Sequence, residues 1–182
     1  MTGPKKLAAG ALLSAIALTG CPAASGRAPS MAPHRGPRLA TTATTATTMR
    51  GLVAYVIDGD TIIVTARARR TRVRLLGLDA PETTPRRDCF GARAVAGLRR
   101  LLPTGTAILL AVDRRRADPY GRALGYVWRA DGMFINRDLI RRGYATTLFL
   151  EPTGPYRAEF AAAEALARAA RAGLWRVCRS VP

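Results

Sequence analysis

The chain has 182 residues and a formal net charge of +17, from 29 lysines and arginines against 12 acidic residues. This length accommodates one domain with its own core plus an appendage, rather than an array of domains. A surface this basic suits polyanions, chiefly nucleic acid or anionic lipid, and charge alone does not choose between them. The only lysines are Lys5 and Lys6, so the remainder is basic through arginine, the better bidentate ligand for phosphate.

The first 20 residues have the features of an export signal. A basic start at Lys5 and Lys6 is followed by an apolar stretch, LAAGALLSAIALTG, that is too short to span a bilayer comfortably. Residues 18–21 resemble the bacterial lipobox, which implies cleavage before Cys21 and lipid modification of its thiol. The alternative is an ordinary secretory signal with a chance cysteine. In both cases we expect export, as a membrane lipoprotein facing outside or as a secreted protein.

Export gives the two remaining cysteines a default interpretation. Cys89 and Cys178 form an even pair in an oxidising compartment, which predicts a disulfide. Such a bond closes a loop of roughly 90 residues and stabilises the fold by about 4 to 5 kcal/mol in the chain-entropy model. Metal ligation by the cysteines needs further ligands, and the only histidine, His34, lies in the linker. We therefore set a cysteine metal site aside.

Residues 21–48 are rich in Ala, Thr and Pro and predict a flexible tether, so that the folded domain occupies residues 49–182. Apolar runs bounded by turn residues predict strands, and periodic stripes predict helices. Asn136 is a plausible N-cap of one helix, and Gly143 its C′ residue. The strands are expected at 51–57, 60–68, 71–78, 106–113 and 122–130, and the helices at 92–102, 136–143 and 156–174.

This order of elements predicts an α+β domain, mainly β, in which five strands form a Greek-key barrel of the OB type. About three helices pack on the barrel. The sequence has no internal repeat, and we expect a monomer.

Three polar clusters interrupt these elements. Asp58 and Asp60 flank Gly59 in a predicted hairpin turn, and a tight turn alone is enough to explain these residues. Arg74 precedes Asp79 and Glu82, and it shares strand parity with apolar neighbours, so it needs an anionic partner or ligand. An ion pair at the strand end satisfies this need, and so does a catalytic site. The third cluster is Asp118-Pro119-Tyr120-Gly121-Arg122, which is also typical of a solvated basic loop.

Together the clusters suit phosphodiester hydrolysis. This reaction needs a hard cation on oxygen ligands, a carboxylate that orients water, and cationic donors for the phosphate. Asp60 and Asp79 supply the oxygen ligands for the cation, and Glu82 is the carboxylate that orients water. Arg74 and Arg122 are the cationic donors for the phosphate. The ends of strands distant in sequence converge at the mouth of a small barrel, which makes a common site possible.

The motifs DGDT, VRLLGLDAPE, DPYGRALGYVW and INRDLIRRGYA, with GLW in the closing helix, resemble the staphylococcal nuclease (thermonuclease) family. The resemblance covers roughly residues 50–176, and the order of the motifs is more specific than any one of them. It implies an OB-fold, calcium-dependent nuclease that cleaves DNA and RNA with little sequence preference. It also implies products with 3′-phosphate ends.

The resemblance assigns roles by position. It makes Asp60, Asp79 and the backbone carbonyl of Ala80 ligands of Ca²⁺, with Asp58 as a carboxylate close behind them. Glu82 takes the place of the carboxylate that orients water.

Arg74 and Arg122 match the two phosphate-binding arginines, and Tyr120 matches a tyrosine that lines the nucleotide site. Leu148 and Leu150 stand where the best-known member has two tyrosines, and leucine neither donates to phosphate nor stacks as well. The alternative is a nuclease-like domain, catalytically weak or inactive, that only binds nucleic acid. A basic structural protein of the cell envelope explains the charge but not the carboxylates.

Overall fold

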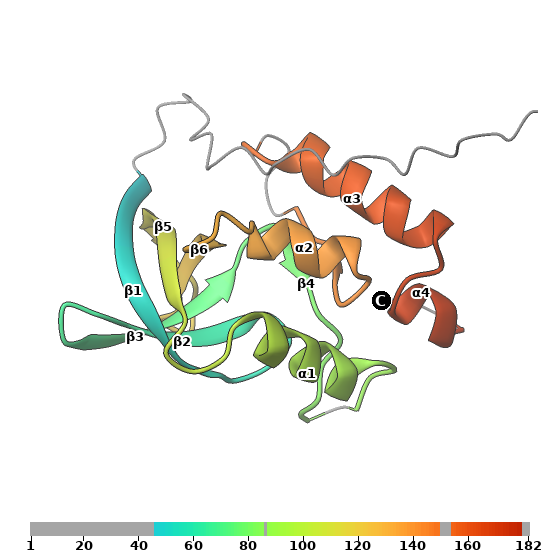
Figure 1. Ribbon diagram of the computed structural model, residues 1–182, viewed down its shortest axis with the longest axis horizontal. Coiled ribbons are helices and arrows are strands. Elements are labelled where there is room, and N and C mark those ends of the chain that lie inside the picture. Colours follow the sequence, from blue (N-terminus) through green and yellow to red (C-terminus); the bar gives the residue numbers. More distant parts are fainter. Residues whose placement is uncertain (1–45, 86, 150–153, 180–182) are drawn as a thin grey trace, which may run out of the picture. The chain divides into compact units, whose positions relative to one another are not determined.

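Five strands close into a barrel in the order β1-β2-β3-β6-β5 in the computed structural model, which describes residues 46–85, 87–149 and 154–179. All neighbours are antiparallel except β3 and β6, which are parallel. The helices lie outside the barrel, as Figure 1 shows. The elements are β1 (Ala46–Val56), β2 (Thr61–Ala66), β3 (Arg69–Leu75), β4 (Leu78–Asp79), α1 (Gly91–Leu101), β5 (Ala107–Ala117), β6 (Ala123–Arg129), α2 (Ile135–Arg141), β7 (Thr146–Thr147), α3 (Arg157–Ala169) and α4 (Leu174–Val177).

The core fills the barrel and continues beneath the helices. Ile62 and Val73 are fully buried register partners on β2 and β3, and Leu98 of α1 and Leu139 of α2 are fully buried as well. The expected α+β barrel of the OB type with about three helices is confirmed by this arrangement. Within the described residues, no helix is both long and apolar enough to cross a membrane.

The domain begins earlier than expected. β1 starts at Ala46, and its first residues pair with β5, so the strand includes the last three positions of the predicted tether at 21–48. The predicted signal segment, Cys21 and the rest of the tether lie outside the described residues.

The expected strand 71–78 is in fact two strands. β3 ends at Leu75, Gly77 takes a positive φ of 80°, and Leu78–Asp79 forms the separate strand β4. The Cβ of any other residue at Gly77 would lie 2.4 Å from the ring of Phe160, so glycine also allows a close approach to α3. The parity argument for Arg74 was therefore wrong. Its buried neighbours are Val73 and Leu75, and the side chain of Arg74 is aimed away from the core they form.

The expected helix 156–174 is also divided. α3 ends at Ala169, and the chain turns at Gly173 before the single turn of α4. Gly173 packs directly on Gly143, because a Cβ at Gly173 would lie 2.1 Å from the carbonyl oxygen of Gly143. Leu174 N–H then donates to that same oxygen at 2.9 Å. The pair of glycines thus joins α4 to the end of α2.

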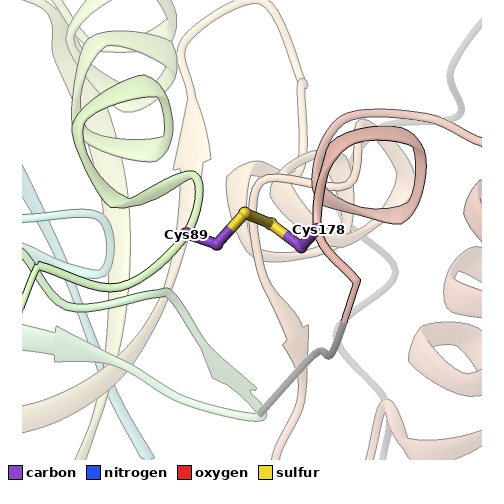
Figure 2. The surroundings of a disulfide bond; sticks show 2 residues. All are labelled: Cys89 and Cys178. Carbon is purple, nitrogen blue, oxygen red and sulfur yellow. A yellow bond between two sulfur atoms is a disulfide. The ribbon is translucent and has the colours of Figure 1, made fainter.

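A disulfide joins Cys89 to Cys178, with a Cα–Cα distance of 5.8 Å and a sequence separation of 89 residues. Figure 2 shows the bond between the segment that enters α1 and the segment that leaves α4. The first and last helices of the domain are therefore linked covalently.

Asn136 has a different role from the expected N-cap. Phe134 occupies the N-cap position of α2, and Asn136 is fully buried inside the helix. Its Oδ1 accepts from Val127 N–H at 2.9 Å, and its Nδ2 donates to the carbonyls of Leu76 and Gly125 at 2.9 and 3.3 Å. One side chain thus joins α2 to β6 and to the end of β3, next to Arg74.

Replacing Asn136 by alanine is expected to lower the free energy of unfolding by about 2 to 4 kcal/mol, because it leaves backbone groups buried without partners. Urea denaturation measures the loss. Arg137→Ala on the same helix is the matched control and is expected to change stability by no more than about 1 kcal/mol, because within the described residues Arg137 makes one partly exposed ion pair, with Glu159. Equal losses in the two variants would contradict this role for Asn136.

Candidate active site

Asp60 is the most buried carboxylate at the mouth of the barrel, with 4% of its surface exposed. It follows the turn between β1 and β2, where Asp58 Oδ1 accepts from Asp60 N–H at 3.1 Å and fixes the turn. Asp60 Oδ1 accepts from the Thr61 hydroxyl at 3.0 Å, and its Oδ2 accepts from Ala80 N–H at 3.1 Å. This side chain therefore joins the first hairpin to the segment after β4.

Arg74 lies between two carboxylates. Its Nη2 donates to Asp79 Oδ1 at 2.6 Å, and its Nη1 contacts Asp60 Oδ2. The backbone supports this arrangement, because Leu75 N–H donates to the carbonyl of Asp60 at 2.8 Å. Asp60 and Asp79 are thus near enough to share one cation, which here is the guanidinium of Arg74.

Glu82 lies beside this group, on the exposed segment that leads from β4 to α1. Desolvation raises the pKa of Glu82, and the negative charges of Asp58 and Asp79 raise it further, whereas Arg74 opposes them. These influences place Glu82 within electrostatic range of the whole cluster. A carboxylate with a raised pKa holds a proton more readily, which suits a group that accepts or orients one.

Arg122 is held in a second group, on the turn between β5 and β6. Asp118 accepts from the backbone N–H groups of Tyr120 and Arg122 at 3.0 and 2.8 Å, and its Oδ2 also accepts from Arg122 Nε. Burial acts to raise the pKa of Asp118, but the bonds from Arg122 outweigh it and lower that pKa. The guanidinium of Arg122 also lies 5.4 Å from the centre of the Tyr120 ring.

The two groups approach each other through strand pairing. Arg74 on β3 is the register partner of Leu124 on β6, two residues after Arg122. Arg122 directly precedes β6, so the turn that carries it lies at the end of the strand that pairs with β3. Arg122 is nevertheless paired with Asp118 and not with the carboxylates around Arg74. Tyr120 is 80% exposed beside it.

The oxygen atoms around Arg74 suit a hard divalent cation as ligands. Asp60 and Asp79 face one shared point, and Ala80, whose N–H is bonded to Asp60, brings its backbone to the same place. All of the oxygens offered are carboxylate or carbonyl oxygens, the ligands that Ca²⁺ prefers. The described residues include no group of three or more His, Cys, Asp or Glu side chains suited to a metal. The calcium site that the resemblance implies does not form such a group, because it offers two carboxylate side chains and one backbone carbonyl.

The sequence pattern did not predict β7, the strand that pairs with the strand containing Asp79. β7 pairs antiparallel with β4, so that Asp79 lies opposite Thr146, whose hydroxyl donates to the Asp79 carbonyl at 3.4 Å. Two-residue strands carry no periodic signal, and only the paired threonines at 146–147 hint at a strand. Leu148 follows with 40% of its surface exposed, and Leu150 lies outside the described residues.

Gly59 allows the two halves of the carboxylate group to meet. A Cβ at this position would lie 2.5 Å from the Cβ of Ala80 and 3.2 Å from that of Ala94. The turn that carries Asp58 and Asp60 is therefore packed directly against the backbone next to Asp79.

Gly59→Ala is expected to separate Asp60 from Ala80 and to lower the rate of the cleavage that the family resemblance implies by about 10-fold to 100-fold, since misplacement of site groups by about 1 Å has effects of this size. Initial rates on the denatured DNA that the resemblance implies as a substrate measure the effect. Gly154→Ala is the control, because a Cβ there meets nothing within 4 Å. If both variants cleave like the parent protein, contact between this turn and Ala80 is not needed for activity.

Comparisons with known proteins agree with this geometry. Residues 72–177 match the model of the family described as staphylococcal nuclease homologue. The chain is 38% identical over 128 residues to a thermonuclease of Staphylococcus intermedius, covering 68% of this chain and 74% of that protein. It is 33% identical over 134 residues to an uncharacterized endonuclease of Escherichia coli, covering 74% of this chain and 82% of the relative. Endonuclease YhcR of Bacillus subtilis is 36% identical over 137 residues, but the chain spans only 11% of its length.

Proposed function

This chain belongs to the staphylococcal nuclease family and is a nuclease, and we propose that it is a calcium-dependent enzyme that hydrolyses phosphodiester bonds of DNA and RNA with little sequence specificity. The observation that carries the proposal is the convergence of Asp60 and Asp79 on Arg74, with Glu82 beside them. A domain that only binds nucleic acid needs cations, but it does not need two carboxylates held at one point.

Each residue has a defined role in this proposal. Asp60, Asp79 and the carbonyl of Ala80 hold Ca²⁺, which when bound supplies positive charge against a phosphate oxygen. Glu82 orients the attacking water and accepts its proton. Arg74 and Arg122 donate hydrogen bonds to the phosphate oxygens as negative charge develops there.

The remaining residues of the site set its environment. Asp58 fixes the turn that carries Asp60 and keeps the pKa of Glu82 raised. Tyr120 offers an exposed ring for the sugar or base next to Arg122. The family resemblance extends the proposal to products with 3′-phosphate ends. The predicted export signal and the predicted lipidation of Cys21 extend it to a protein that acts outside the cytoplasm, anchored by lipid or released.

Chelation of divalent metal is expected to abolish cleavage of denatured DNA, and added Ca²⁺ is expected to restore it. The reason is that without a cation the charge of Asp60 and Asp79 is neutralised only by Arg74, which then has fewer donors left for the phosphate. Release of acid-soluble nucleotides measures the rate, and retention of a labelled oligonucleotide measures binding. Binding in chelator without any cleavage in Ca²⁺ would favour the alternative, an inactive domain that binds nucleic acid.

A further inference from the structure

A second cationic site lies away from the carboxylate group, in a pocket of about 410 Å³ between α1, the end of α2 and α4. We call it the arginine pocket. Its lining includes four arginines and two aromatic rings, namely Arg93, Arg100, Arg142, Arg176, Phe90 and Tyr144. None of these residues belongs to the proposed cleavage site.

Most of the positive charge in this pocket is not neutralised. Arg142 pairs with Asp138, whereas Arg100 donates to the neutral hydroxyl of Tyr144 at 3.2 Å. Arg93 lies with its guanidinium 5.8 Å from the centre of the Phe90 ring. In the described part of the chain, no carboxylate pairs with Arg93, Arg100 or Arg176. Three guanidinium groups around one concavity are therefore available to an anion.

The aromatic rings give the pocket a second kind of contact. Phe90 and Tyr144 stack with their centroids 6.0 Å apart and their planes inclined by 29°. Proteins bind single-stranded nucleic acid by combining a cationic groove for the backbone with aromatic rings on which bases stack. The pocket offers both.

One short segment connects the arginine pocket with the cleavage site. The helix start at Gly91 packs on Glu82, because a Cβ at Gly91 would lie 2.4 Å from the Glu82 carbonyl oxygen. Asp88 N–H donates to that same oxygen at 2.9 Å. Phe90 lies between these two contacts in the chain, so the helix start that carries Phe90 is held beside the backbone of Glu82.

The disulfide holds two walls of the pocket together. Cys89 directly precedes Phe90, and Cys178 follows Arg176 by two residues. Figure 2 shows the bond that joins the two cysteines. The distance between Phe90 and Arg176 is therefore restricted by a covalent bond. This restriction favours a binding function, since a pre-organised pocket loses less entropy when it binds a ligand.

We propose that the arginine pocket is an additional polynucleotide subsite, which binds a phosphate and stacks a base of the same strand that is cleaved beside Glu82. This proposal rests on the proposed function, because it takes nucleic acid as the substrate. We favour a polynucleotide over an anionic membrane because the arginines surround a concavity with stacked rings, which a single strand enters and a flat lipid surface does not.

The test removes two pocket charges without touching the cleavage residues. Arg93→Gln combined with Arg176→Gln is compared with Arg99→Gln combined with Arg179→Gln, which removes two exposed arginines that do not line the pocket. Fluorescence anisotropy with dodecathymidylate in chelator, at several salt concentrations, measures binding without cleavage. The pocket variant is expected to bind about tenfold more weakly. Its plot of log affinity against log salt is expected to be shallower by about 0.7, the change for one lost phosphate contact with single-stranded DNA. The control is expected to keep the slope of the parent protein.

The possible outcomes distinguish failure of the pocket proposal from failure of the proposed function. Equal losses in the two double variants would overturn the pocket, because they would reflect bulk charge. A loss confined to binding of vesicles that contain phosphatidylglycerol would also overturn it, in favour of a membrane site. Absence of cleavage by the parent protein in Ca²⁺ would remove the proposed catalytic function, even if the pocket variant still lost oligonucleotide binding. Dithymidylate, whose single phosphodiester is the one cleaved and leaves no second phosphate for the pocket, is expected to be cleaved equally by the parent protein and both double variants.

Discussion

Replacing Arg74 by lysine is expected to lower kcat for DNA cleavage by about 100-fold or more, the usual effect of removing one donor to a developing negative charge. Lysine keeps the charge but not the planar fork, so it cannot contact two anionic groups in the way that Arg74 contacts Asp60 and Asp79. Single-turnover rates on an oligonucleotide, at saturating Ca²⁺ and enzyme, measure the chemical step apart from binding.

Arg72→Lys is the matched control, since Arg72 lies two residues earlier on β3 and is exposed. It is expected to cleave like the parent protein. A melting temperature in Ca²⁺ close to that of the parent would show that the Arg74 variant is folded. If folded Arg74→Lys keeps its rate, the phosphate donor lies elsewhere in the molecule.

Loss of the disulfide is the change with the largest expected effect on stability. Cys89→Ser combined with Cys178→Ser is expected to lower the free energy of unfolding by about 4 to 5 kcal/mol, because the bond closes a loop of roughly 90 residues in the unfolded chain. Such a loss is comparable with a large fraction of the stability of an ordinary domain. Guanidinium denaturation of the oxidised parent and of the double variant measures the difference.

Reduced parent protein is the matched control for the double variant, since it lacks the bond but keeps the sulfur atoms. It is expected to unfold at the same denaturant concentration as the double variant. Equal stability of the oxidised and reduced parent would contradict the entropic argument. The bond also fixes the arginine pocket, so reduction is expected to weaken oligonucleotide binding even where the protein remains folded.

The barrel could be predicted from the sequence because its signals are local. Apolar runs and the Asp-Gly turn at 58–59 define β1 and β2. The next reversal lies at Arg67 and Ala68, which both take positive φ, and not after the expected strand 60–68. The break after Leu75 was missed because the apolar residues continue through Leu76 and Leu78, and only Gly77 interrupts them. The division between α3 and α4 was missed for a similar reason, since the apolar spacing runs on to Leu174.

The composition of the candidate site could be predicted, but what holds it in place could not. Asp60, Asp79 and Arg74 were expected at one site from residue types and from the family resemblance, and the structure brings these three together. The pairing of β4 with β7 and the hydrogen bonds of buried Asn136 depend on long-range contacts that leave no pattern in the sequence. The arginine pocket is likewise assembled from residues between Phe90 and Arg176, far apart in the chain.

The covalent bridge also changes what proteolysis does to this molecule. Asp60, Asp79 and Glu82 all precede Cys89, whereas Arg122 and β7 lie between the two cysteines. A peptide bond cut anywhere between Cys89 and Cys178 therefore yields two fragments that remain one covalent molecule. The nicked protein would migrate as a single species on a non-reducing gel and as two on a reducing gel. Nuclease activity that survives a cut between Cys89 and Arg122 would show that the fragment with the carboxylates keeps its place against the fragment with Arg122.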